Sequence, residues 1–146
     1  MAAELDLHTV IATRLRGDGQ RYTANRRALI DELVAADAPV TIPELLDRRR
    51  DLAQSSAYRN LAVLEASGAV HRIVTSDEFA RYELAEDLTG HHHHLICEAC
   101  GAVTDFTVSA RVERTLGRAL DDVAAETGFT AGHHRLDLVG TCAGCS

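Results

Sequence analysis

The sequence predicts an α+β protein made of two small domains, and three observations lead to this expectation. The first half of the 146-residue chain places apolar residues at helical spacing, with capping residues before each run. The second half contains short alternating segments around one longer helical segment. All four cysteines and six of the eight histidines lie after residue 90. A chain of this length buries one good core or two small ones.

The N-terminal half is expected to be helical. Residues 4–16 carry apolar side chains at helical spacing, and Thr23 is a suitable N-cap for a second helix to about Ala36. Thr41 can cap a short third helix that tolerates Pro43 in its first turn. Ser55 or Ser56 can cap a fourth helix, which Gly68 would end.

A two-stranded hairpin is predicted directly after Gly68. "AVHRIVT" and "ARYELA" alternate polar and apolar residues around the turn "SDEF". Short helices followed at once by a hairpin form a winged helix-turn-helix, whose last helix enters the major groove of DNA. The residues expected on that helix to face DNA are Ser55, Ser56, Tyr58, Arg59 and Asn60; the alternative is that Tyr58 and Arg59 are ordinary surface residues.

The polar segment "AEDLTG" is predicted to be a hinge linker between two domains. It divides the chain into residues 1–84, the DNA-binding domain; 85–90, the linker; and 91–146, a second domain. In the second domain we expect a strand through "HHHHLIC", a strand "AVTDF", a helix from about Ser109 to Thr127, and a strand "FTAGHHRLDLVG".

Composition limits the possible functions and locations. The net charge of -7 argues against a protein that coats nucleic acid nonspecifically, although all 15 basic residues are Arg and many lie in the first 60 positions. No apolar run approaches the roughly 18 residues of a membrane span, and the N-terminus lacks the features of a signal peptide. We therefore expect a cytoplasmic protein.

The four cysteines form two Cys-x-x-Cys pairs that predict a structural zinc site. Four thiolates in two knuckles suit a closed tetrahedral Zn²⁺ site, which leaves no position open for catalysis. A redox function is the weaker reading, because two such motifs coexist. The predicted ligands are Cys97, Cys100, Cys142 and Cys145.

Four consecutive histidines, residues 91–94, precede the first cysteine pair. In an extended strand, alternate side chains point to opposite faces, so one strand could supply two metal sites. One expected set joins the two domains and consists of His71, Glu83, His92 and His94. The other lies within the second domain and consists of His91, His93, Glu113 and His134.

The combined motifs resemble the ferric uptake regulator family of metal-sensing bacterial repressors along nearly the whole chain. The resemblance rests on "RYTANRRALIDEL", "SSAYRNLAVLEASGAVHR", "HHHHLICEACGAVTDF" and "HHRLDLVGTCAGC". It implies a homodimer with an N-terminal winged helix and a C-terminal α/β dimerisation domain. It also implies the three metal sites above, DNA reading by Tyr58 and Arg59, and an approach of Arg21 to the minor groove.

Departures from the family pattern bear on the identity of the metal. Pro39 lies where iron-sensing members supply a histidine, and His71 occupies the wing position that zinc-sensing members use. The cysteine that zinc-sensing members place before the linker is absent, and Glu83, with Glu86 as a substitute, resembles the acidic ligand of iron sensors. The resemblance is therefore closest to the zinc-sensing branch, with Fe²⁺ or Mn²⁺ as alternatives.

We expect a metal-dependent transcriptional repressor that binds double-stranded operator DNA and controls zinc uptake or homeostasis genes. Alternatives within the family are iron- or peroxide-responsive regulators. An enzyme is not expected, because the sequence lacks HExxH, a nucleophile elbow and a phosphate-binding loop. A zinc-ribbon metalloenzyme and a metal buffer are the readings from other classes.

Overall fold

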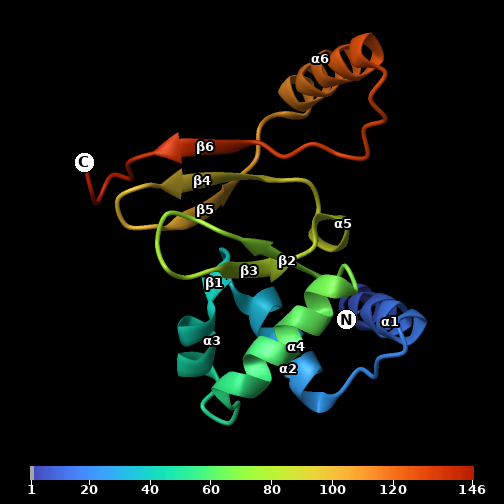
Figure 1. The fold of residues 1–146 in the computed structure, drawn as a ribbon, viewed down its shortest axis with the longest axis vertical. Helices are drawn as coiled ribbons and strands as arrows, with labels where there is room; N and C mark the ends of the chain where they lie inside the picture. Colours follow the sequence, from blue (N-terminus) through green and yellow to red (C-terminus); the bar gives the residue numbers. More distant parts are fainter. Residues whose placement is uncertain (1) are drawn as a thin grey trace.

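The computed structural model describes residues 2–146, with side chains from residue 7 onward. Helices and a three-stranded sheet form the N-terminal unit, and a second three-stranded sheet with one long helix forms the C-terminal unit. The two sheets lie next to each other between the N-terminal helices and the long C-terminal helix (Figure 1). This mixture of helices and strands confirms the predicted α+β class.

Four helices make up most of the N-terminal unit: α1 (Ala2–Gly17), α2 (Ala24–Ala35), α3 (Ile42–Arg48) and α4 (Gln54–Ala66). Their apolar faces share one core with the first sheet, and Ile11, Leu15, Ile30, Leu61 and Leu64 are fully buried in it. Burial of such side chains stabilises a fold by about 1.5–3 kcal/mol each. Within the described chain, no helix is long and apolar enough to cross a membrane.

Among the N-terminal helices, two of the predicted N-caps are confirmed and one is wrong. The side chain of Thr23 accepts a hydrogen bond from the backbone N–H of Arg26, and Thr41 forms a reciprocal capping box with Glu44. Helix α4 instead begins at Gln54, and its N-cap Ala53 makes no side-chain cap. Ser55 and Ser56 therefore lie inside the first turn, where the Ser56 hydroxyl accepts from the Asn60 side chain.

The predicted wing hairpin belongs to a three-stranded sheet in the order β1-β3-β2. Its strands are β1 (Val40–Thr41), β2 (Val70–Ile73) and β3 (Arg81–Leu84). All pairings are antiparallel, and the register sets His71 opposite Glu83. Because paired residues point to the same face of a sheet, these two side chains share a face.

The segment between the two sheets is partly helical, in contrast to the irregular linker predicted. Residues Glu86–Thr89 form a short helix, α5, which ends at Gly90. Leu88 packs against the N-terminal core. This contact anchors the short helix. The helix was not predicted, because four residues are too few to show helical periodicity in the sequence.

The second sheet is centred on β4 (His93–Cys97), which lies between β5 (Val103–Phe106) and β6 (Asp137–Gly140). β4 pairs antiparallel with β5 and parallel with β6. The long helix α6 (Ala110–Thr127) connects them; Ser109 caps its start and Gly128, in a left-handed conformation, ends it. The last predicted strand is shorter than expected, because residues 129–136 are irregular.

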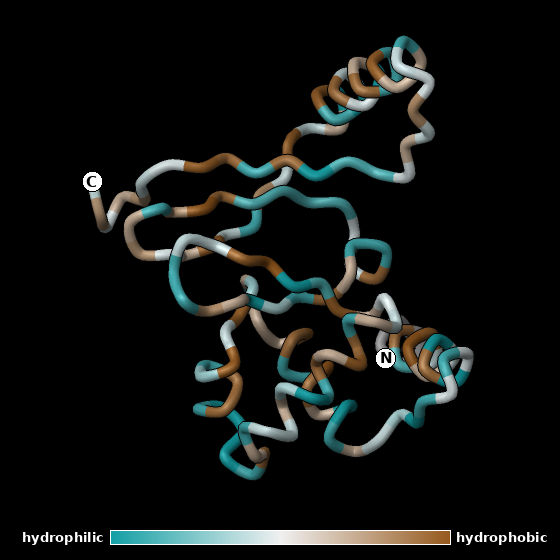
Figure 2. Tube along the Cα trace, in the orientation of Figure 1, coloured by the Kyte–Doolittle hydropathy of each residue, from teal (hydrophilic) through white to brown (hydrophobic). Residues whose placement is uncertain are grey.

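Helix α6 has no buried residue in the single chain, although its apolar and polar residues segregate to different sides (Figure 2). Val112 and Val123 on this helix are 51% and 55% exposed, and Leu138 on β6 is 62% exposed. The buried side chains among residues 91–146 are few, so the C-terminal unit has little apolar core of its own. An amphipathic helix whose apolar side is exposed in the single chain indicates a surface that another chain covers.

The tip of the wing contacts the first cysteine knuckle. The Ser76 hydroxyl donates to the backbone carbonyl of Glu98 at 3.1 Å. Asp77, held by a two-pronged ion pair with Arg81, lies directly against Gly101. Gly101 has φ +75°, and a Cβ at this position would overlap the Asp77 carboxylate.

Gly101→Ala should therefore destabilise the zinc-loaded protein and displace the wing tip. The left-handed backbone alone costs an L-residue about 1–2 kcal/mol, and the overlap with Asp77 adds to this. Thermal unfolding should show a lower Tm for Gly101→Ala, which Asp77→Ala in the same chain partly restores. Gly144→Ala is the matched control in the second knuckle, because its nearest contact is 3.9 Å away; equal losses for both variants would contradict the wing contact.

Candidate metal centres

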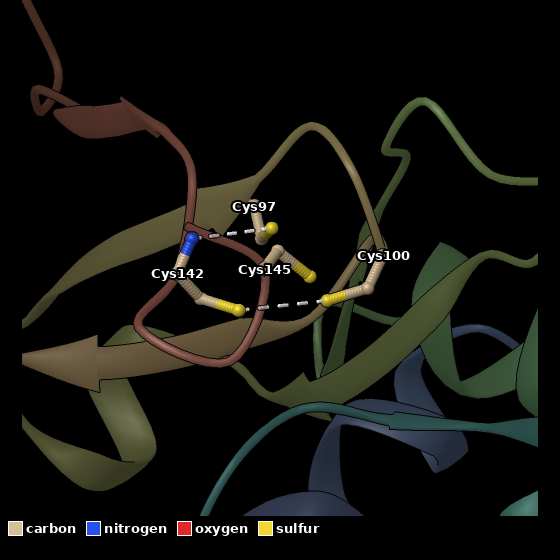
Figure 3. A group of neighbouring side chains, drawn as sticks. All are labelled: Cys97, Cys100, Cys142 and Cys145. Carbon is tan, nitrogen blue, oxygen red and sulfur yellow. Dashed lines mark hydrogen bonds between the residues drawn. The ribbon is translucent and has the colours of Figure 1, made fainter.

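Four cysteine side chains from two distant segments converge at one end of the second sheet (Figure 3). Cys97 ends β4, Cys100 closes the turn after it, and Cys142 and Cys145 follow β6. The sulfur atoms of Cys100 and Cys142 are 3.9 Å apart, too far for a disulfide and close to the edge of about 3.8 Å in a tetrahedron with Zn–S bonds of about 2.3 Å. The set fits Zn²⁺.

The protonation of the cysteines also favours a cation among them. The backbone N–H of Cys142 donates to Cys97 Sγ at 3.3 Å, and this hydrogen bond, together with the backbone N–H groups of Cys100 and Ala99, lowers the pKa of the Cys97 thiol to about 6. Contacts with the other thiols, Cys142 foremost, raise the pKa of Cys145 to about 12. Without a cation the cluster therefore holds one thiolate readily and resists the next, whereas a divalent ion stabilises all four.

A second group joins the two sheets and consists of Glu83, His92, His94 and Asp105, whose ligand atoms all lie within 4.8 Å of one another. We call it the hinge group. Glu83 comes from β3 of the wing, and its two carboxylate oxygens lie 2.9 Å from His94 Nε2 and 3.0 Å from His92 Nε2. Asp105 on β5 approaches the same two nitrogen atoms at 3.6 and 4.0 Å. Two imidazoles and two carboxylates converging in this way can hold one divalent cation.

The outward-facing nitrogen of each hinge histidine has its own partner. His92 Nδ1 lies 3.0 Å from the carbonyl of Gly90, and His94 Nδ1 lies 3.3 Å from Asp137 Oδ1. Such partners orient the ring and direct the other nitrogen toward a metal. Burial disfavours the charged forms, but hydrogen bonds to Gly90 and Glu83 raise the pKa of His92, and hydrogen bonds to Glu83 and Asp137 raise that of His94.

The membership of the hinge group differs from the predicted set in one position. His71 lies outside the converging atoms, although it lines the same pocket as Glu83, His92 and His94. Its Nε2 is buried without a hydrogen-bond partner among the described residues, and burial, together with Arg135, lowers its pKa. Asp105 occupies the place instead, because the β4–β5 register pairs it with His94. Given the register of the hairpin, the two-residue alternation of "AVTDF" would have placed Asp105 on the face of His94.

The third group lies on the opposite face of β4 and contains His91, His93, Glu113 and His134, as predicted. We call it the helix group, because Glu113 is on α6. The Nε2 atoms of His91, His93 and His134 each lie 2.8 Å from a carboxylate oxygen of Glu113. Glu113 Oε1 and His134 Nε2 are buried without a hydrogen bond in the described chain, so they approach without hydrogen-bonding geometry. A shared cation would satisfy both atoms.

Glu86, the predicted substitute for Glu83, does not reach the hinge group. Its carboxylate contacts Nδ1 of His91, on the side of that ring away from Glu113. The structure therefore places Glu86 beside the helix group and leaves Glu83 as the carboxylate from the wing at the hinge group.

The predicted DNA-facing residues fall into two kinds. Arg21, Ser55, Tyr58 and Arg59 are exposed, Tyr58 to 50%. Asn60 is half-buried and accepts from Arg26 Nε at 3.0 Å, while its amide donates to Ser56. Ser56 and Asn60 thus fasten α4 to α2, and the exposed side chains are the ones available to a ligand.

The chain is similar to known proteins over most of its length. Residues 17–139 match the Ferric uptake regulator family. The peroxide operon regulator of Bacillus subtilis strain 168 is 31% identical over 137 residues, which cover 90% of this chain and 88% of that protein. The Helicobacter pylori ferric uptake regulator Fur, whose structure reveals three functional metal-binding sites, has a TM-score of 0.74 at 21% identity and covers 96% of this chain and 91% of its own. A zinc-bound manganese uptake regulator has a TM-score of 0.61 at 28% identity, over 90% of this chain and 98% of its own.

Metal binding at the hinge group should weaken as the pH falls, with the onset above pH 6.5. The pKa values of His92 and His94 are raised above 6.5, so protons compete with the metal before a free imidazole would charge. Each histidine that must lose a proton lowers the affinity by up to about tenfold per pH unit. Chelator competition between pH 8 and pH 5.5, on protein that retains its Cys-bound zinc, measures this directly.

Unfolding of protein that keeps its Cys-bound zinc but has an empty hinge group provides the control, because the pH trend of its stability has the opposite sign. A raised histidine pKa contributes stability that is fully present below pH 6.5 and is lost as the pH rises through the raised value. A metal affinity that does not change over this range would contradict coordination by His92 and His94.

Proposed function

The chain belongs to the ferric uptake regulator family and is a metal-responsive transcriptional regulator, and from that premise we propose that it represses zinc-uptake or zinc-homeostasis genes when metal binds its hinge group. Residues 1–84 act as the DNA-binding domain, 85–90 as the hinge and 91–146 as the dimerisation domain. The regulator acts in the cytoplasm as a homodimer on double-stranded DNA.

The observation that carries this proposal is the position of Glu83 in the hinge group. Glu83 belongs to the wing sheet, whereas His92, His94 and Asp105 belong to the second sheet. A shared divalent cation supplies the charge that holds carboxylates and imidazoles from both sheets together. A ligand that binds only one interdomain arrangement shifts the population toward it by its differential affinity.

The arrangement of the two domains that the metal favours then determines how the helices meet DNA. Arg14 and the Gly68 carbonyl join α1 to the end of α4, so the helices of the DNA-binding domain move with the wing as one body. Tyr58 and Arg59 on the exposed side of α4 face the major groove, and Arg21 approaches the backbone or minor groove. In a dimer, the two copies of α4 match successive grooves only at the correct angle.

Dimerisation is supported by the exposed apolar surface of α6 and β6. Val112, Val123 and Leu138 are each more than half exposed in the single chain. A second copy of the same surface is the partner that fits, since most soluble oligomers are symmetric homodimers.

The proposed metals are assigned by ligand type. Cys97, Cys100, Cys142 and Cys145 hold structural Zn²⁺, and no position remains open for chemistry at that site. At the hinge group, Nε2 of His71 is buried and has no hydrogen-bond partner among the described residues. It supports a regulatory Zn²⁺, because a small shift of the wing would add a third imidazole to His92 and His94.

A second candidate is a peroxide-responsive regulator that binds Fe²⁺ or Mn²⁺. Asp105 in the hinge group favours it, because two carboxylates and two imidazoles suit these harder ions. The similarity to the peroxide operon regulator points the same way. In such a sensor, peroxide would oxidise a hinge histidine around bound iron.

Replacing both His92 and His94 with Ala should remove most of the metal-stimulated DNA binding while the Cys-bound zinc stays in place. The probe is a duplex selected from a random library by the wild-type, zinc-loaded protein. Fluorescence anisotropy measures affinity with and without added Zn²⁺, and zinc content is measured in parallel. His133→Ala is the matched control, since His133 is exposed and belongs to none of the three groups; unchanged metal dependence in the double variant would rule out the hinge assignment.

His71 and Asp105 are the two candidates for the fourth ligand of the hinge group, and they lead to opposite predictions. If zinc is the regulatory metal, His71→Ala should raise the free Zn²⁺ concentration needed for DNA binding by about tenfold or more, and Asp105→Ala should have the smaller effect. If Fe²⁺ or Mn²⁺ is the metal, Asp105→Ala should have the larger effect on titration with those ions. Mass spectrometry after treatment with Fe²⁺ and peroxide tests the second candidate, which requires an oxygen added to His92 or His94.

A further inference from the structure

The short helix α5 contacts the helix group through a single side chain. The Glu86 carboxylate contacts His91 Nδ1, and the other ring nitrogen, Nε2, lies 2.8 Å from Glu113 Oε1. Within the helix group, it is therefore the His91 ring that α5 contacts. Its side chain is 33% exposed, so packing alone does not fix the orientation of the ring.

The same helix also contacts the DNA-binding domain. Asp87, the next residue, forms an ion pair with Arg14 of α1. The other terminal nitrogen of Arg14 donates to the Gly68 carbonyl at 2.7 Å, directly after the end of α4. Leu88 packs against the N-terminal core. Within four residues, α5 therefore connects the helix group to the end of the predicted recognition helix.

We propose that Glu86 positions His91 for metal binding at the helix group, and that α5 transmits occupancy of this group to α4 through Asp87 and Arg14. This inference rests on the proposed function, because it adds a second metal input to the same DNA-binding switch.

The chemistry of histidine ligands supports the role of Glu86. A metal-ligating imidazole usually donates its other N–H to a carboxylate, which fixes the tautomer, orients the ring and makes the ligating nitrogen more basic. Glu86 Oε1 is buried beside Nδ1 of His91 without a hydrogen bond among the described residues, so an Nδ1–H there would satisfy it, while Nε2 points into the helix group. Glu86 is therefore a positioning residue rather than a ligand.

The geometry also explains how the hinge would respond to the metal. Without a metal on Nε2, the ring proton of His91 can occupy either nitrogen, and only the tautomer with Nδ1–H can donate to Glu86. Once its Nε2 is bound, the Nδ1–H has one direction, and the hydrogen bond to Glu86 holds the first turn of α5 against the second domain. The ion pair of Asp87 with Arg14 then holds the opposite side of α5 against the first.

Metal affinity tests the first half of the proposal without reference to DNA. Glu83→Ala with His94→Ala disables the hinge group, and Co²⁺ titration monitored by its visible absorption then reports the helix group. Adding Glu86→Ala should lower the Co²⁺ affinity by about 10- to 100-fold, whereas Glu86→Gln, whose amide oxygen still accepts from Nδ1–H, should lose less. Asp87→Ala is the control with no His91 contact and should leave the affinity unchanged.

DNA affinity in the same background tests the second half. Loading the helix group with Zn²⁺ should raise the affinity for the selected duplex, and both Glu86→Ala and Asp87→Ala should remove this increase at saturating metal. Asp87→Ala should do so with its metal affinity intact, a separation that a merely structural residue would not produce. Tm and zinc content of each variant verify folding.

The outcomes separate the two proposals. Full Co²⁺ affinity in Glu86→Ala would overturn the positioning role, and full Zn²⁺ stimulation in Asp87→Ala would overturn transmission through α5. If the wild-type protein showed no metal-stimulated DNA binding at all, the proposed function would fail, and transmission would fail with it, while the Co²⁺ titration would still decide the role of Glu86.

Discussion

The register of β4 between its two neighbouring strands is the constraint on which all three metal groups depend. Parallel pairing with β6 sets Cys97 beside Gly140, and antiparallel pairing with β5 sets His94 beside Asp105. Because a strand alternates its faces, this register sends His92 and His94 toward the wing and His91 and His93 toward α6. A slip by one residue would exchange the two histidine pairs and separate the four cysteines.

Little apolar packing is available to maintain that register. Among residues 91–146 the buried side chains are those of His93, His94, Cys97 and Val103, besides Gly101. The cysteine cluster links the ends of β4 and β6 across 45 residues, so an ion bound there would supply much of the free energy that orders the sheet. An ion at the cysteine cluster would in this sense be a precondition for the other two groups, although the cluster shares no residue with them.

Local chemistry was readable from the sequence, and long-range register was not. The capping oxygens of Thr23 and Thr41 and the alternation of the histidine run depend on neighbours a few residues away, so they were predicted correctly. The approach of Asp105 to His94 depends on how a hairpin closes, and the contact of Glu86 with His91 depends on the path of a four-residue helix. Neither Ser55 nor Ser56 caps α4, because the helix begins at Gln54 and both serines lie in its first turn.

The uncovered face of α6 ties the lifetime of the protein to its own concentration. None of the residues of α6 is buried in one chain, so the free energy that keeps this helix docked increases with the fraction of paired chains. Chains diluted below the dissociation constant would present a long amphipathic helix to proteases and chaperones. Degradation would then remove unpaired copies before paired ones.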